Sequence, residues 1–349
     1  MYIYKDEKLG FIELFNEKNG TLLRSDVNGI NPYMRSFPEL IDVGVMGHCT
    51  SSTYCRNAGI DCYQQGNCVS NPHMSVKNFE MIARQASGKT FQFALGGAGD
   101  PNKHPYFEEL LRICRYYRIV PNLTTSGFCL ADKEIDCIKK YCGAVAVSWY
   151  TRLKDGTESN PATLKAIERL YVAGCTINAH FIVSCETIDE AIERLSGNGF
   201  PKSLNAVIFI LYKPVGFGKK YKLLDVKDSR VARFIKLALK KHNFQVGFDT
   251  CFTPALLRYA NNISVSSIDA CEAATFSMYI DSRLNCYPCS FGIWGNIKPD
   301  NLHVKTIRQV WEGKQFTEFR EHRKEKCCNC SQKMTCRYGC RLGLEIDLC

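Results

Sequence analysis

The stretch Leu40-Ile-Asp-Val-Gly-Val-Met46-Gly-His-Cys49 decides the fold of this chain. The residues from Leu40 to Met46 are mostly apolar, which is typical of a buried strand. Ser75–Ala86 then predicts a helix opened by a serine cap, and Phe91–Leu95 predicts the next strand. A strand, a helix and a second strand in this order favour a βαβ unit with parallel strands.

The same alternation continues to about residue 241. Further strands are expected at Ile119–Thr124, Ala144–Trp149, Thr176–Val183 and Ala206–Leu211, and further helices at His104–Tyr117, Lys133–Lys140, Pro161–Val172, Ile188–Leu195 and Val226–Lys241. Right-handed crossovers would wind these units into an α/β fold, a partial (β/α)6 barrel similar to a TIM barrel. In such folds the chemistry lies at the carboxyl ends of the strands.

Three regions are expected along the 349 residues. Residues 1–38 form an N-terminal extension with a small hairpin near Glu17–Gly20, and residues 39–245 form the barrel. Residues 246–349 form a cysteine-rich domain, because turn residues and cysteines dominate there and Thr306–Glu312 is the one clear helix. A segment with so little apolar mass is expected to fold around metal.

Cysteine is the unusual part of the composition, with 20 residues in an otherwise ordinary globular balance of 45% hydrophobic and 23% charged residues. The N-terminus lacks the basic and apolar regions of a signal peptide. The longest apolar run, Ala206–Leu211, is too short to cross a membrane. We therefore expect a cytoplasmic protein whose reduced thiols bind metal or carry out chemistry.

The net charge of +10 admits an anionic ligand or an acidic partner. The densest basic run, Arg320–Lys326, is interrupted by glutamates. We interpret it as a solvated face, and expect neither a nucleic acid nor a membrane as a partner.

The first cysteine group, Cys49, Cys55 and Cys62, lies in the loop after the first barrel strand. Three thiolates there could hold three irons of a [4Fe–4S] cluster and leave the fourth iron open to a ligand. The alternative is a tetrahedral zinc site with Cys68 or His48 as the fourth ligand. The spacing alone favours neither metal.

The last cysteine group has the spacing C-x2-C-x5-C-x3-C at Cys327, Cys330, Cys336 and Cys340, and Cys349 follows. Cys251, Cys271 and the turn Cys286-Tyr-Pro-Cys289 lie upstream. Eight well-placed thiols suit two four-thiolate sites, and zinc accepts the same ligands as an iron–sulfur cluster. The open three-thiolate site at the barrel rim favours iron, because zinc ribbons have no such site.

These motifs resemble radical S-adenosylmethionine (SAM) enzymes. The resemblance is carried by the strand Pro38–Met46 and by the three-cysteine loop that follows it and ends Cys62-Tyr63. The spacing of the three cysteines is C-x5-C-x6-C, whereas the family usually has C-x3-C-x2-C. Cys68 is therefore a spare candidate ligand. By resemblance, SAM would be bound by the glycine stretch and by the following strand ends, at Gly96, Gly97, Ala98, Gly99, Ser126, Ser148, Tyr212 and Val215.

The tail resembles the SPASM subgroup, which carries two auxiliary [4Fe–4S] clusters. Leu284 stands where the subgroup usually has glycine. The resemblance implies a first auxiliary cluster on Cys251, Cys271, Cys289 and Cys340, and a second on Cys327, Cys330, Cys336 and Cys349. With the cluster on Cys49, Cys55 and Cys62, three [4Fe–4S] clusters and SAM are expected as cofactors.

The resemblance implies reductive cleavage of SAM to a 5′-deoxyadenosyl radical and post-translational modification of a ribosomal peptide, by thioether or carbon–carbon cross-linking. The alternatives are radical oxidation, epimerisation or backbone excision on a protein or small molecule, and a zinc-binding protein that is no enzyme. Flavodoxin or ferredoxin is the expected electron donor, and a separate leader-binding protein is expected beside the precursor peptide. Asp100 and His104 are the candidate acid–base residues, although residues in such positions more often serve a turn or a cap than catalysis.

Overall fold

The structure is a computed structural model, and it describes residues 1–349 except 19, 31, 52–53, 56–60, 151–160, 198, 221, 261–262, 265–266, 343–345 and 347. Part of the first cysteine loop therefore lies outside the described residues. All of the predicted site residues lie within them.

A mostly parallel sheet forms the centre of the molecule. Within the described residues it has ten strands in the order β10-β9-β8-β7-β6-β5-β4-β11-β12-β13. Their bounds are β4 Leu40–Met46, β5 Gln92–Gly97, β6 Val120–Thr125, β7 Val145–Trp149, β8 Ile177–Val183, β9 Ala206–Leu211, β10 Gln245–Phe248, β11 Ser277–Ile280, β12 Asn285–Tyr287 and β13 Asp300–Asn301. The six predicted barrel strands are β4 to β9, so the predicted α/β fold is confirmed.

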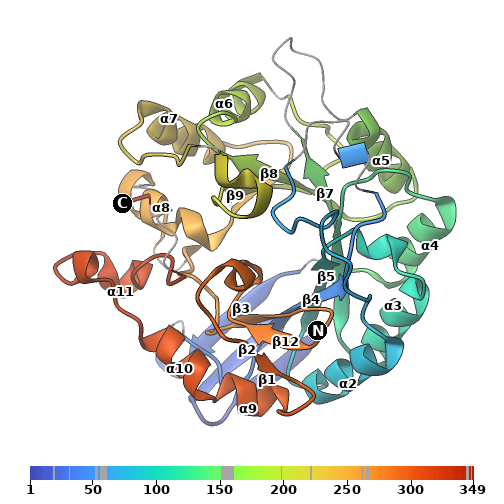
Figure 1. Ribbon diagram of the computed structural model, residues 1–349. Coiled ribbons are helices and arrows are strands. Elements are labelled where there is room, and N and C mark those ends of the chain that lie inside the picture. The colour runs from blue at the N-terminus through green and yellow to red at the C-terminus, as the bar shows by residue number, and fades with distance from the viewer. Residues whose placement is uncertain are drawn as a thin grey trace.

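Helices pack outside the sheet, and Figure 1 shows them following one another around the arc of strands. Their bounds are α2 Val76–Ala86, α3 Phe107–Tyr116, α4 Asp132–Tyr141, α5 Pro161–Val172, α6 Ile188–Gly197, α7 Ser229–Ala238, α8 Thr253–Tyr259, α9 Ile307–Trp311, α10 Lys314–Glu321 and α11 Lys333–Cys336. Side-chain caps fix several starts: the Ser75 hydroxyl accepts from the Asn78 N–H at 3.2 Å, and Asp228 caps α7.

The two faces of the parallel strands differ in their packing. On β8, Ala179 and Phe181 are fully buried under the helices, whereas Asn178 and His180 on the other face are half-buried. Strands β6 and β9 alternate in the same way. The outer face therefore forms the hydrophobic core, and the inner face keeps access to solvent.

Residues 246–349 continue the central sheet. Strand β11 pairs in parallel with β4, and β12 and β13 follow antiparallel. The expected helix Thr306–Glu312 is confirmed as α9, with a capping box between Thr306 and Gln309. The prediction of a single clear helix in this segment was wrong, since α8, α10 and α11 also form there.

The N-terminal residues form a three-stranded antiparallel sheet of β1 Tyr2–Asp6, β2 Phe11–Phe15 and β3 Leu22–Asp26. The predicted hairpin is the connection between β2 and β3. An ion-pair network anchors this sheet: the Arg24 guanidinium contacts the Glu39 carboxylate and lies 3.2 Å from the Glu272 carboxylate. The extension is thereby tied to the segment that carries Cys271.

The described part of the chain contains no helix that is both long enough and apolar enough to cross a membrane.

Candidate functional site

The first cysteine loop packs against the glycine stretch at the carboxyl ends of β4 and β5. The Cys49 N–H donates to the Gly66 carbonyl at 2.8 Å, and a Cβ on Gly66 would lie 1.8 Å from the Ala98 carbonyl oxygen. A Cβ on Gly99 would lie 2.8 Å from the His48 carbonyl oxygen. Glycine is therefore required for the two segments to approach this closely.

The three thiols of the first group are neighbours. Burial raises the pKa of Cys55 to about 12, and the negative charges of Asp100, Cys49 and Cys62 contribute to the rise. Burial also raises the pKa of Cys49, with further contributions from Asp100 and Cys62. Thiols that raise one another's pKa in this way favour a shared cation, because a metal centre would relieve their mutual repulsion.

Cys68 is exposed, and its described contact is a backbone hydrogen bond, from its N–H to the Gln65 carbonyl at 2.8 Å. The contacts of the thiols thus support Cys49, Cys55 and Cys62 over the spare residue. The ligand assignment itself stays a prediction.

Asp100 joins two strand ends beside this group. Its carboxylate accepts from the Ser126 N–H at 3.0 Å and from the Ser126 hydroxyl at 2.5 Å. Burial raises the pKa of Asp100, and the hydrogen bonds from Ser126 oppose the rise. Two of the predicted SAM-binding positions, Gly99 and Ser126, are thereby brought to one place.

Space for a ligand exists at the glycine stretch. A Cβ on Gly96 would meet no atom within 4 Å, and Gly97 has a φ of +117°, in the region that favours glycine. Tyr150, which was not predicted as a site residue from the sequence, interacts electrostatically with Cys55 and Asp100 and forms a hydrogen bond with Ser148. Soft thiols, an open backbone and converging polar groups fit an iron–sulfur cluster with a bound SAM.

His104 is held by the backbone on both sides of its ring. Its Nε2 lies 3.0 Å from the Met74 carbonyl oxygen, and its Nδ1 accepts from the Tyr106 N–H at 3.1 Å. His73 lies between His104 and His48, with ring centroids 5.7 Å and 4.2 Å away. These contacts favour a role in holding the chain before Cys49, and a catalytic role for His104 stays a prediction.

A surface cavity of about 580 Å³ opens beside these histidines. Its lining includes His73, Lys77, His104, Tyr106 and Glu109. The cavity lies at the starts of α2 and α3, and the residues that line it do not belong to the glycine stretch.

The loop after β9 reaches both cysteine-rich parts of the chain. The Phe217 N–H lies 3.4 Å from the Cys62 carbonyl oxygen, and a Cβ on Gly216 would lie 2.2 Å from the Tyr63 carbonyl oxygen. Val215 and Tyr212, two predicted SAM-binding residues, are buried in this loop. The loop that carries these predicted positions therefore contacts the first cysteine loop through Gly216 and Phe217.

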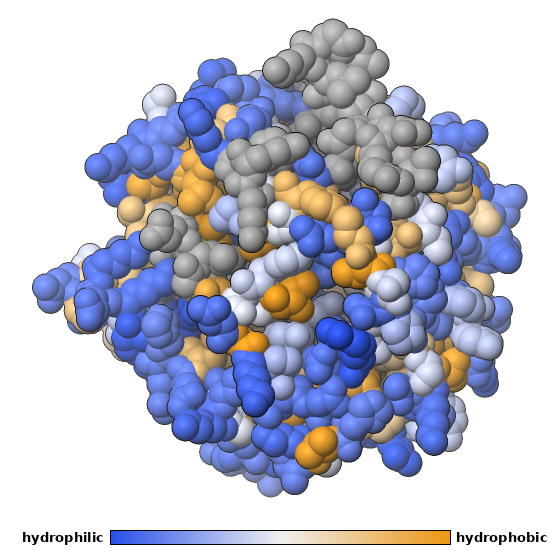
Figure 2. Space-filling view, viewed as in Figure 1, coloured by the Kyte–Doolittle hydropathy of each residue, from blue (hydrophilic) through white to orange (hydrophobic). Residues whose placement is uncertain are grey.

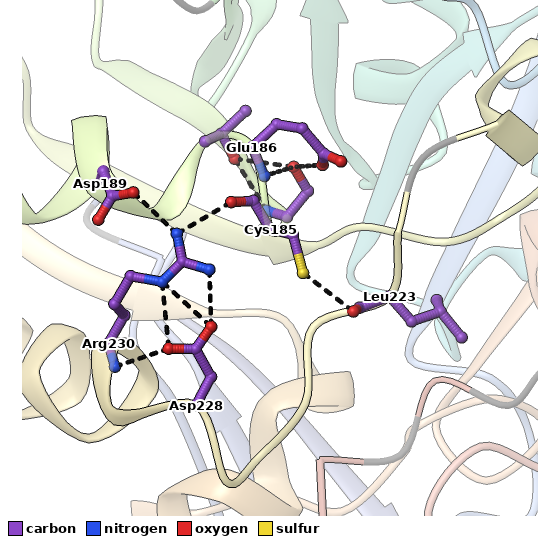
Figure 3. A network of polar contacts seen from close by, with 8 residues as sticks. Cys185, Glu186, Asp189, Leu223, Asp228 and Arg230 are labelled. Carbon is purple, nitrogen blue, oxygen red and sulfur yellow. Dashed lines mark hydrogen bonds and ion pairs between the residues drawn. The ribbon is translucent and has the colours of Figure 1, made fainter.

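A polar network fixes the other end of this segment (Figure 3). Arg230 donates to Asp189 at 2.8 Å, to the Cys185 carbonyl at 3.2 Å and to Asp228 at 2.6 Å. The Cys185 thiol donates to the Leu223 carbonyl at 3.0 Å. Cys185 therefore has a structural role here.

The four thiols predicted for the first auxiliary cluster also form one group. Burial raises the pKa of Cys251 well above its ordinary value, and Cys271 and Cys340 add to the rise. Burial likewise raises the pKa of Cys289, with contributions from Cys271 and Cys340. The four residues come from four separate segments, which supports a common ligand.

The second auxiliary group is less defined. The Cys330 N–H donates to the Cys327 carbonyl at 3.1 Å within one turn, Cys336 ends α11, and Cys349 is exposed at the C-terminus. This ligand set stays a prediction. Within the described residues, no three Cys, His, Asp or Glu side chains lie at the spacing of ligands to a single metal ion. A four-iron cluster holds its thiolates farther apart than a single ion does, because the cluster lies between them.

The turn before Cys289 keeps a glycine-like backbone. Leu284, at the position where the SPASM subgroup usually has glycine, has a φ of +69° and is fully buried. The leucine therefore preserves the turn and adds core contacts.

Comparison with known proteins supports this assignment. Residues 271–336 match the model of the SPASM family, an iron–sulfur cluster-binding domain. We call this stretch the SPASM region. It contains Cys271, Cys289, Cys327, Cys330 and Cys336, whereas the other predicted auxiliary ligands lie outside it.

Solved structures share the fold over nearly the whole chain. Streptococcus suis SuiB bound to S-adenosylmethionine has a TM-score of 0.71 and 17% identity, with 97% of this chain and 95% of that chain covered. SuiB bound to precursor peptide SuiA has a TM-score of 0.66 and 19% identity over 88% and 72% of the two chains. Polyhistidine-tagged anSMEcpe with bound AdoMet has a TM-score of 0.61 and 15% identity over 89% and 87%.

No curated protein sequence is significantly similar to the chain. The structural matches and the SPASM region together confirm the resemblance to radical SAM enzymes of the SPASM subgroup that the sequence suggested. At these identities the matches establish the fold alone.

Proposed function

We propose that this protein is a radical SAM/SPASM enzyme that modifies a ribosomally made peptide. The observation that carries the proposal is the meeting of Cys49, Cys55 and Asp100 with the glycine stretch at the carboxyl edge of a parallel sheet. A [4Fe–4S] cluster with an open iron, when bound, supplies the electron that cleaves SAM into a 5′-deoxyadenosyl radical.

The chain's own residues would bind and orient SAM. Gly96 leaves the space above the backbone open, and Ser126 is fixed by Asp100. Ser148, Tyr212 and Val215 would complete the contacts at the later strand ends. The protein contributes binding, orientation and exclusion of water, while the difficult bond cleavage belongs to the cofactor.

Access to the inner face of the sheet supports a substrate larger than SAM. Asn122, Thr124 and His180 on this face are half-buried, and Ile182 is 49% exposed. Figure 2 shows apolar residues toward the middle of the viewed face with hydrophilic residues around them. Two proteins with this fold have been solved with peptides: SuiB with SuiA, and anSMEcpe with Cp18Cys.

Three further parts of the proposal rest on the resemblance alone. They are a thioether or carbon–carbon cross-link as the product, three [4Fe–4S] clusters as the complement, and a separate leader-binding protein as an additional partner. The cytoplasm is the proposed location.

The proposed electron donor is a small acidic redox protein such as flavodoxin or ferredoxin. Residues 213–241 contain ten lysines and arginines against two aspartates, and so hold +8 of the chain's net charge of +10. Arg233 and Lys236 on α7 and Lys240 just after it are exposed, and none of them has an ion pair with another described residue. Such a surface would attract an acidic protein.

The test is anaerobic incubation with dithionite and SAM, followed by quantification of 5′-deoxyadenosine. We expect release from the wild type and none from a Cys49→Ala, Cys55→Ala, Cys62→Ala variant. Bound zinc with little iron and no 5′-deoxyadenosine would refute the proposal.

A further inference from the structure

A buried ion pair lies between the two cysteine-rich parts of the chain. The Lys213 ammonium, at the end of β9, is 2.6 Å from the Asp249 carboxylate at the end of β10. Its side chain is 5% exposed, and it also donates to the Leu211 carbonyl at 2.9 Å. The Asp249 carboxylate accepts from the Leu211 N–H at 3.3 Å, so both charges are held by the strand ends.

The surroundings of Lys213 connect the two cysteine groups. Its ammonium lies 4.8 Å from the ring centroid of Phe291, two residues after Cys289. The Phe291 ring lies 5.0 Å from the ring of Tyr63, which follows Cys62. Lys213 is therefore a fixed cation at the junction of the predicted SAM site and the predicted auxiliary site.

Lys213 acts directly on two of the auxiliary thiols. Burial alone would lower the pKa of Lys213, but Asp249, Cys251 and Cys289 together raise it above its ordinary value. The positive charge of Lys213 favours the thiolate form of Cys251, and the negative charge of Asp249 opposes it. Lys213 likewise favours the thiolate form of Cys289. Lys213 is therefore a buried cation that acts on two predicted cluster ligands, with Asp249 as its counter-charge.

A buried cation favours the more negative state of any centre beside it. Reduction of an iron–sulfur cluster adds one negative charge, and net charge and burial are among the factors that set cluster potentials. Charges interact strongly where water is excluded. The stability of the fold offers a weaker reason for this pair, because buried ion pairs are often replaceable by apolar residues at little cost.

We propose that Lys213 raises the reduction potential of the auxiliary cluster on Cys251, Cys271, Cys289 and Cys340, and that Asp249 limits this rise. The proposal rests on the proposed function, since it requires that cluster. Lys213 acts on the cluster through its positive charge. Asp249 holds the Lys213 ammonium in place and partly offsets that charge.

The experiment is a redox titration of the loaded, full-length protein by EPR, following the signal that is lost in Cys289→Ala. Lys213→Met removes the cation, and we expect a shift to a more negative midpoint potential. Asp249→Asn removes the anion, and we expect a shift in the opposite direction. The double variant should return close to the wild-type potential, and Lys213→Arg should retain it.

The matched control is Arg194→Met on α6. Arg194 is 4% exposed and lies 2.6 Å from Glu190, so this variant removes an equally buried cation from a pair outside the sheet. We expect its auxiliary potential to equal that of the wild type. Iron and sulfide are measured for every variant, so that loss of the cluster is distinguished from a change in its potential.

Two results would overturn the inference. If Lys213→Met and Asp249→Asn shift the potential in the same direction, or leave it unchanged at full iron content, the pair has a structural role only. If Lys213→Met fails to fold, the Asp249→Asn shift still decides the sign. If the wild type itself binds no auxiliary cluster, the proposed function fails first, and the iron analysis reveals this before any titration.

Discussion

Replacement of Gly216 by alanine tests whether the loop after β9 truly rests on the first cysteine loop. Gly216 has a φ of +57°, and an added Cβ would lie 2.2 Å from the Tyr63 carbonyl oxygen and 2.8 Å from the Tyr63 Cα. Left-handed backbone costs a non-glycine residue about 1 kcal/mol. Forcing an atom into a packed site costs about 1–3 kcal/mol more.

Gly88 provides the matched control. It has a φ of +73°, and an added Cβ there would meet no atom within 4 Å. Gly88→Ala should therefore lose only the backbone contribution, about 1 kcal/mol of unfolding free energy. Gly216→Ala should lose about 3 kcal/mol in total, because the steric contribution is added.

The assay is urea unfolding of the metal-free proteins, with comparison of midpoints at equal slopes. Iron content after anaerobic reconstitution is the second readout, since displacement of Tyr63 also moves Cys62. We expect Gly216→Ala to be the less stable variant and to bind less iron. Equal midpoints and equal iron content in the two variants would refute the contact between these loops.

Three further predictions concern charges of the site and its surface. Burial raises the pKa of Asp42, on the inner face of β4, to about 7. Its neutral form therefore stabilises the fold below about pH 4, and that stability is lost as pH rises toward 7. The urea midpoint of Asp42→Asn should match that of the wild type at pH 4 and exceed it at pH 8. An equal difference between the two midpoints at both pH values would contradict this. Ser126→Ala removes the 2.5 Å hydrogen bond to Asp100, so the affinity for SAM, measured by calorimetry, should fall about tenfold. The control variant Ser87→Ala, which is remote from the site, should bind SAM with the affinity of the wild type. A triple variant, Arg233→Gln, Lys236→Gln, Lys240→Gln, should be reduced more slowly than the wild type by flavodoxin at low salt and at the same rate by dithionite. Equal rates of reduction by flavodoxin in the variant and the wild type would exclude this surface as the docking site.

The barrel strands could be predicted because each combines an apolar run with a following helix. β4 to β9 lie where the hydrophobic pattern placed them. β10 was not predicted, since Gln245–Phe248 is short and only partly buried. β11, β12 and β13 have four, three and two residues, and they gain their order from the pairing of β11 with β4, which local sequence does not reveal.

The candidate site was predictable where its residues lie in one motif. The cysteine loop and the glycine stretch could be aligned because parallel strands end at one edge. Lys213 and Asp249 are 36 positions apart and meet only because β9 and β10 are neighbours. Likewise, the rings of Tyr63 and Phe291 meet across two distant segments, and no pattern in either segment indicates the other.

Leu284 shows how the structure explains a departure from the expected motif. Its φ of +69° is unfavourable for leucine, yet its side chain is fully buried. Burial of a leucine is worth about 2–3 kcal/mol, which exceeds the backbone cost of about 1–2 kcal/mol. The usual glycine can therefore be replaced here without loss of the turn.

The measurement that tests the central claim most directly is iron and acid-labile sulfide per chain after anaerobic reconstitution, combined with 5′-deoxyadenosine release on addition of dithionite and SAM. We predict about 12 irons in the wild type, for three four-iron clusters, and about 8 in the Cys49→Ala, Cys55→Ala, Cys62→Ala variant, which should release no 5′-deoxyadenosine. Zinc in place of iron, or unchanged iron content in that variant, would contradict the assignment of the first cysteine group.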